Sequence, residues 1–303
     1  MVSLRAIPAS ASRAAPRRLG LALRSRVAGD DAPERAQRIW GAEGERWFTS
    51  EDPIWRVNAD AAMFPGGISA LLLQSLHPSA MAGVAGHSGY KGDPWGRLQR
   101  TSHYLAVTTF GTIADAEQAI AHVQSVHHVV RGTDELGRPY SADDPHLLRW
   151  VHVAEIWSFL NAFQAYAADP LTPDEADLYV EQANRAASLL GATELPTSVA
   201  ELDQALEDYR PELQATTAAR EAMRFMLLHP PVPMVARPGY ALIAAGGVAL
   251  LPTWARRSLR LPVYGPGVAL ASRAGGLSTA LVRWGMAGLE ERRPGDRAQD
   301  AAS

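Results

Sequence analysis

The sequence of 303 residues contains no cysteine. This absence excludes disulfide bonds, iron–sulfur clusters, thiolate-ligated haem and cysteine nucleophiles. The side chains that remain as ligands for a soft or borderline metal are nine histidines and seven methionines.

The chain also lacks an excess of positive charge and a long apolar run. Its 29 basic and 32 acidic residues give a formal net charge of −3, which offers no electrostatic case for a nucleic-acid partner. The longest apolar run, residues 239–251, stops at Pro252, short of the about 18 residues that cross a bilayer. It predicts a buried core helix. Peripheral membrane contact stays open as an alternative because basic and aromatic residues follow the run, namely Trp254, Arg256, Arg257 and Arg260.

The two ends of the chain differ in composition from the rest. The first 29 residues hold six arginines and no acid. An export signal needs an apolar stretch of about 7–15 residues, and the stretch after Arg17 and Arg18 covers only residues 19–23. We therefore expect a cytoplasmic protein. The predicted organisation is a disordered basic tail over 1–34, one domain over 35–285 and a flexible tail over 286–303.

Helical periodicity dominates, and no run of alternating β-branched residues predicts a strand. The expected fold class is all-α, in a single domain with short connections. Capping residues mark helix starts at Asp93, at Thr172, at Ser198, and at either Thr216 or Thr217. Helices are predicted over residues 68–76, 94–110, 115–131 and 145–168, with a polar loop over 132–145.

One histidine of the predicted helix 115–131 lies on its apolar face. At about 100° per residue, His127 shares a face with Ala116, Ala119, Ile120, Val123, Val126 and Val130. His122 points to the opposite side, and His128 lies at the margin. A buried imidazole needs a hydrogen bond, a metal or a cofactor. His127 is therefore either a hydrogen-bonded core residue or a ligand.

The predicted helix 94–110 carries a polar stripe. Arg97, Thr101, Tyr104 and Thr108 follow at intervals of four, three and four, with Arg100 at the edge. Guanidinium groups bind carboxylates in a bidentate manner and stay charged when buried, so the stripe suits a carboxylate-bearing ligand. The alternative is a solvent-exposed helix face. A cofactor with one metal and two carboxylates would engage both helices, and haem b is the plain candidate.

Two further segments carry polar residues among small or apolar ones. Between His77 and His87 nearly all residues are small, which favours close packing against a flat ligand or another helix. In the helix 145–168, His152 and Glu155 form a second polar pair, as pocket residues or as a buried hydrogen-bonded pair.

The order of these motifs resembles a known family. The chain has an HP…HS element (His77 to Ser88), a DPWGRLQRT element from Asp93, an H-x-x-V-R-G-like element from His127, and a GRPY…DDP loop (Gly137 to Pro145). In combination they are similar to the catalytic domain of bacterial rubber oxygenases (latex-clearing proteins) and MpaB-type oxygenases. The similarity covers roughly residues 45–262.

The resemblance implies a globin-like helical core with haem b and a proximal histidine, which matches His127. Arg97, Arg100 and Thr101 match an Arg-x-x-Lys-Thr stretch that lines the haem pocket. Arg100 replaces the lysine that approaches the iron from the distal side. Because arginine stays protonated and is a poor ligand, the distal position is expected to be open.

The function favoured at this point is a haem b-dependent oxygenase that acts on an apolar small molecule, isoprenoid- or polyketide-like, with dioxygen. His127 would bind the iron, Arg97 and Arg100 the propionates, and Arg100, Thr101 and His87 would line the catalytic side. Gly83, Gly86 and Ala82 would leave room for the substrate. Two alternatives remain: a haem-binding or sensor protein without turnover, and a cofactor-free helical protein of a membrane surface or of protein interactions.

Overall fold

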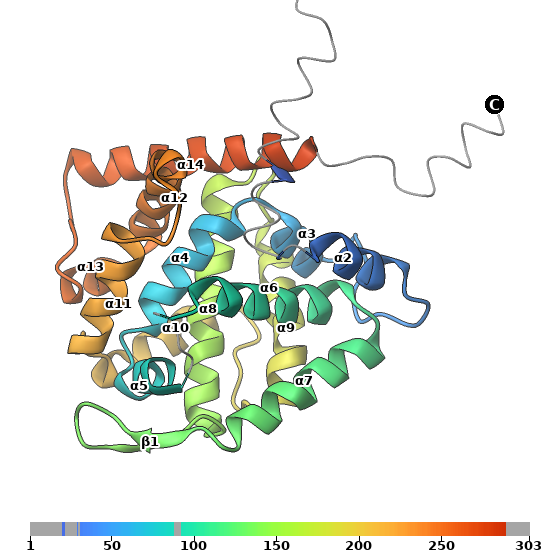
Figure 1. Cartoon of the computed structure of the whole chain (residues 1–303), viewed down its shortest axis with the longest axis horizontal. Coiled ribbons are helices and arrows are strands. Elements are labelled where there is room, and N and C mark those ends of the chain that lie inside the picture. The colour runs from blue at the N-terminus through green and yellow to red at the C-terminus, as the bar shows by residue number, and fades with distance from the viewer. Residues whose placement is uncertain (1–19, 22–28, 30, 88–91, 289–303) are drawn as a thin grey trace, which may run out of the picture.

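The computed structural model describes residues 20–21, 29, 31–87 and 92–288 (Figure 1). Within them the chain forms helices and one two-stranded hairpin, so the all-α class is confirmed; the globin-like arrangement stays a prediction. The longer helices are α2 (Ala32–Gly41), α3 (Pro53–Ala59), α4 (Met63–Gln74), α5 (Pro78–His87), α6 (Pro94–Phe110), α7 (Ile113–His127), α8 (Pro145–Tyr166), α9 (Pro173–Leu190), α10 (Val199–Asp208), α11 (Thr217–Leu228), α12 (Arg237–Leu250), α13 (Thr253–Ser258) and α14 (Pro266–Ala287). Two 3-10 turns, η1 (Arg210–Glu212) and η2 (Met234–Ala236), flank α11.

Helix α8 is the centre of the fold, because twelve of its 22 residues are buried. The Asp144 side chain accepts a hydrogen bond from the N–H of His146, and Pro145 occupies the first helical position. Trp150 of α8 is fully buried, in one core with residues of α4, α9 and α10. Burial of this core supplies most of the driving force for folding.

The capping signals in the sequence set the helix starts well. Thr172 and Glu175 form a reciprocal capping box at α9, which ends at Gly191 with a left-handed φ of 115°. At α10 only half of such a box forms, because Glu201 accepts from Thr197 rather than from Ser198. Helix α11 begins after Thr216, the first of the two predicted capping threonines.

Other boundaries differ from the prediction. Helix α7 ends at His127, not near Arg131, because residues 131–133 (β1) pair antiparallel with Pro139–Ser141 (β2). These strands have only three residues each, too few for an alternating pattern. The segment predicted as helix 68–76 begins earlier, at Met63, and is followed by α5.

The hairpin is fixed by one buried carboxylate. Asp134 accepts hydrogen bonds from the Ser79 hydroxyl of α5, from Arg138 and from the N–H of Leu136. Next to it, Glu135 accepts from the first two N–H groups of α11. The polar loop of the sequence is therefore a structural clamp between α5 and α11.

Helices α12 and α14 form an outer layer against α4 (Figure 1). Their backbones meet where Gly246 faces Gly275, since a Cβ added at Gly246 would lie 2.5 Å from the Gly275 Cα. Arg283 of α14 forms an ion pair with Asp60 at 2.9 Å. The run 239–251 is thus helical, but only Ala244, Gly246 and Gly247 of α12 are buried, so the prediction of a buried core helix holds only for its inner face.

The predicted tails fall mostly outside the described residues. Helix α2 begins at Ala32, inside the predicted N-terminal tail, and α14 ends at Ala287. Within the described ranges no single helix is long and apolar enough to cross a membrane; α4 and α5 reach that length and composition only together, as a pair bent by 106°.

Candidate functional site

Helices α6 and α7 form two sides of a wedge. They are joined by the short turn at Gly111 and Thr112, and Figure 1 shows them diverging from this turn toward α8. The buried residues of α6 are confined to 107–110, and those of α7 to Ala116 and Ile120. Farther from the turn, Val123 and His127 of α7 and Tyr104 of α6 are only half-buried. We call the end at the turn, near which both helices have their buried residues, the closed end of the wedge, and the opposite end, where they have none, the open end.

The middle of α8 comes near α6 at Glu155, whose charge acts on Tyr104, and we take it as the third side of the wedge. Val151 is 36% exposed although α8 is the central helix, and Glu155, one turn on, is half-buried. Tyr104 of α6 and Tyr179 of α9 lie close enough to Glu155 for its charge to raise the pKa of both phenols further, after burial. Glu155 makes no hydrogen bond with any described residue, and burial raises its pKa to about 7.

His152 does not pair with Glu155. Its Nε2 lies 2.9 Å from the Asn184 Oδ1 of α9, and burial lowers its pKa to about 4. The interpretation of His152 and Glu155 as a mutually bonded pair is wrong. His152 is a satisfied structural residue, and Glu155 is a carboxyl group in the wedge. A lone acid in an otherwise apolar helix was the sequence signal for it.

His127 is the last residue of α7 and lies at the open end of the wedge. Its side chain is half-buried, and its Nδ1 is buried without a hydrogen-bond partner among the described residues. Burial lowers the pKa of His127, which favours the neutral imidazole that binds metals. By contrast, His122 is exposed, and His128 is bound to Asp143 at 2.8 Å. Val126, predicted inward, is 45% exposed.

The predicted anion-binding residues lie along α6 with unequal burial. Arg97 is half-buried and already in contact with another group. The Arg100 side chain is 66% exposed, with its Nη1 3.5 Å from the Asp93 carboxylate, and Thr101 is exposed. His87 is exposed at the end of α5. Their roles toward a cofactor stay predictions.

The small residues of α5 do not leave free space. Tyr140 of the hairpin packs beside Gly83 and Gly86, at 3.5 Å and 3.9 Å from the positions their Cβ atoms would take. The expectation of room for a substrate there is wrong, because this aromatic ring fills it. His77 is buried in the core, with its Nε2 3.5 Å from Glu212.

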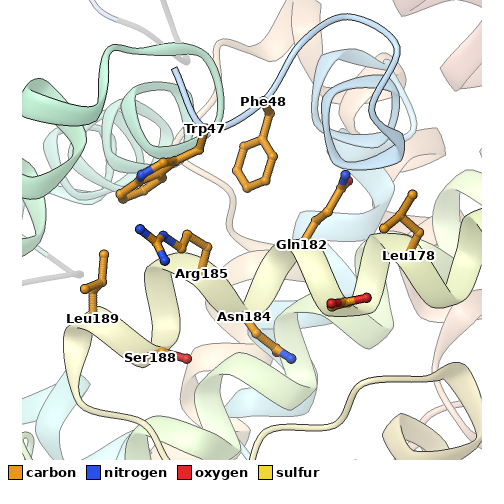
Figure 2. A pocket seen from close by; sticks show the side chains of 9 residues that line it. Trp47, Phe48, Leu178, Gln182, Asn184, Arg185, Ser188 and Leu189 are labelled. Atoms are coloured by element: carbon orange, nitrogen blue, oxygen red, sulfur yellow. The ribbon is translucent and has the colours of Figure 1, made fainter. Parts of the chain in front are cut away.

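A separate open cavity of about 520 Å³ lies on the outer side of α9 (Figure 2). Trp47 and Phe48 cover it, and Arg185 lies over the Trp47 ring at 5.3 Å. Two of its amides are already engaged, since Gln182 bonds Asp52 and Asn184 bonds His152 and Pro196. None of the predicted site residues lines it, so the wedge is the better candidate site.

Among the described residues, no group of three or more His, Asp or Glu side chains is placed to hold a metal ion. Residues 55–284 match the family described as ER-bound oxygenase mpaB/B'/rubber oxygenase, catalytic domain. No curated protein and no solved structure matches the chain.

Proposed function

Because the chain belongs to the family of MpaB-type and rubber-oxygenase catalytic domains, we propose that it is a haem b-dependent oxygenase. His127 would be the protein ligand of the iron, and the wedge between α6, α7 and α8 would hold the cofactor. The substrate would be an apolar small molecule, isoprenoid- or polyketide-like, oxidised with dioxygen. The observation that carries the proposal is the position of His127.

The chemistry of His127 fits the group. A haem iron needs only one axial side chain, and histidine is a common one. His127 offers an imidazole that burial keeps neutral, with no competing hydrogen bond to a described residue. When bound, haem b with one histidine ligand supplies the binding and activation of dioxygen.

The arginines of α6 would hold the cofactor's carboxylates. Arg97 is the stronger candidate because it is half-buried, and a guanidinium–carboxylate pair gains strength where water is excluded. Arg100 would first have to leave Asp93. Thr101 and His87 are exposed, and in this proposal they would contact the exposed edge of the cofactor or the substrate.

Residues of α8 would meet the substrate. Val151, one turn before Glu155 on α8, presents a partly exposed apolar side chain, which suits an apolar molecule. Glu155 has a pKa of about 7, so at neutral pH it exists in both protonation states and can hold or release a proton beside Tyr104.

The test is the absorption spectrum of the purified protein produced with ample haem. Wild type should show a Soret band, and His127→Ala should lose it or most of its haem. The matched controls are His122→Ala, in the same helix as His127, and His128→Ala, at the residue directly after His127. Both should keep the wild-type spectrum. Full haem with an unchanged spectrum in His127→Ala would end the assignment.

Haem binding and oxygenase activity are separated by a second measurement. The ferrous protein is exposed to dioxygen alone and then with a panel of isoprenoids and polyketides. Dioxygen consumption that depends on one substrate supports the oxygenase. A stable dioxygen complex without product across the panel favours the haem-binding or sensor alternative.

A further inference from the structure

Helix α14 turns its small residues inward and its large apolar residues outward. Its buried residues are Gly275, Ser278, Thr279, Val282 and Gly285. Four large apolar side chains are exposed instead, between 45% and 67%: Leu270, Leu277, Leu281 and Trp284. At about 100° per residue these four fall within a sector of about 60°, whose centre lies about 130° from the centre of the buried face. We call these four residues the α14 stripe.

The α14 stripe lies on the outside of the molecule. Figure 1 shows α14 along one edge, packed on α12 and α4 from one side only. Single exposed leucines are ordinary, whereas a line of them on one helix marks an interaction surface. Tyr264, 73% exposed, lies directly before the helix.

The layer that carries the α14 stripe has no acidic residue. Residues 230–288 contain six arginines and no Asp, Glu or Lys, although the whole chain has a net charge of −3. Arg283 is engaged by Asp60, and Arg256 is buried against backbone carbonyls. The other four are exposed and form no ion pair with described residues: Arg237, Arg257, Arg260 and Arg273.

This arrangement corrects one expectation about membrane contact. The residues after the run 239–251 were the candidates for a basic and aromatic surface. Arg256 is instead buried, and Trp254 is half-buried below Arg210, whose guanidinium carbon lies 5.5 Å from the ring. The exposed apolar surface is on α14, one element later.

We propose that the outer face of α14 docks on an anionic lipid surface. The helix would lie parallel to the bilayer, with the α14 stripe in the boundary between head groups and acyl chains. Trp284 suits that boundary because an indole is apolar in its body and polar at one edge. The exposed arginines would face lipid phosphates.

Charge separates a lipid surface from a second copy of the chain. Two copies that met through this layer would bring the same arginines together, and like charges across an interface are unfavourable. An anionic membrane has the complementary charge. The proposal does not depend on haem binding, so the two can fail separately.

The experiment measures cosedimentation of the full-length protein with vesicles. Vesicles of phosphatidylcholine with phosphatidylglycerol should bind it, and phosphatidylcholine alone should bind it much less, with loss at high salt. The double variant Leu277→Gln, Leu281→Gln should weaken binding at least about tenfold. Arg273→Gln should weaken it less. The matched control is Leu178→Gln, Leu189→Gln, two exposed leucines of α9.

Each result decides the proposal. All variants keep the basic N-terminal residues, so binding that survives in the α14 variant belongs to that segment and overturns the inference. Absence of binding by wild type also overturns it. A dimer in light scattering that only the α14 variant disrupts, without vesicle binding, assigns the surface to a second copy. His127→Ala should bind vesicles like wild type.

Discussion

At the scale of single residues, the titration of Glu155 has a measurable consequence for stability. Its pKa is about 7 in the folded protein and near 4.3 in an unfolded chain. The protonated carboxyl group favours the folded state. This contribution to the free energy of unfolding is fully present below the unfolded pKa and is lost as the pH rises through about 7.

Glu155→Gln should therefore raise the free energy of unfolding at about pH 8 by 1–3 kcal/mol, and should change nothing near pH 4. The full difference between the two pKa values would correspond to about 3.7 kcal/mol, and solvent reduces it because Glu155 is only half-buried. Urea unfolding of both proteins across this range is the measurement. An equal effect at both pH values would show that Glu155 does not titrate as described.

His152 acts in the opposite sense. Its pKa of about 4 lies below the usual value, so its contribution is present above about pH 6.5 and is lost on acidification. Between about pH 4.5 and 6.5 the two residues of α8 offset each other in wild type. In Glu155→Gln the loss of stability on acidification should be steeper.

The two arginines of α6 should differ in their hold on haem. Loss of a charge-assisted bond to a carboxylate costs about 1.5–3 kcal/mol, or roughly ten- to a hundredfold in affinity. Arg97→Ala should approach this range. Arg100→Ala should lose less, because its side chain is 66% exposed and solvent screens the pair.

The rate of haem transfer to excess apomyoglobin measures both variants. Arg131→Ala is the control, since Arg131 is equally exposed and lies 3.8 Å from Asp143. If both α6 variants retain haem as well as wild type does, the polar stripe is a solvent-exposed helix face and does not bind the cofactor.

The sequence was informative about single residues where helical spacing decides their position. It placed His127 inward and His122 outward, as observed. It missed the exposure of Val126, because α7 ends one residue later and the chain turns into the hairpin. Whether Arg100 meets solvent or a ligand depends on tertiary placement, which periodicity along one helix does not contain.

At the scale of elements, the contact of α12 with α14 leaves no room for a methyl group. Gly246→Ala should destabilise the protein by at least about 2 kcal/mol, because the new Cβ meets backbone rather than a movable side chain. Gly239→Ala, in the same helix with nothing within 4 Å, should be neutral or stabilising by up to about 1 kcal/mol. Thermal unfolding of the two variants compares them directly.

Element starts were predictable, and several ends were not. Thr172 and Thr216 act locally, because each side chain accepts a hydrogen bond from the N–H group three residues later. A few consecutive residues are therefore enough to predict these helix starts. The hairpin depends on Asp134 reaching Ser79 of α5, a contact between segments far apart in sequence. Nothing in the periodicity of either segment announces it.

At the scale of the whole molecule, we expect the stability of the region between α6, α7 and α8 to depend on a bound cofactor. Its closed end is packed, while its open end lacks buried residues on α6 and α7. A cofactor bound between these helices and α8 would add contacts to residues 94–106 of α6 and 121–127 of α7, none of which is buried.

Haem should therefore raise the melting temperature of wild type. At about a thousand times Kd a ligand adds about 4 kcal/mol to stability, which corresponds to roughly 10 °C. Differential scanning fluorimetry with and without haem checks this, and His127→Ala should show little shift. An equal shift in the variant would mean that haem binds elsewhere.

Composition and motif order sufficed for the all-α class and for the family. They did not place α14, whose small inward residues and large outward residues reverse the usual pattern of a surface helix. A prediction that places large apolar residues in the core would bury the face of α14 that is in fact exposed.

The meeting of Gly246 and Gly275 also bears on how this protein can evolve. A side chain gained at either position would force the two helices apart, and the partner position can offer no compensation, being already without one. Among related proteins we therefore expect glycine to be kept at both positions as long as the two helices keep this close contact. Any lineage that acquires a larger residue at one of them should also have changed the angle at which the outer layer crosses the rest.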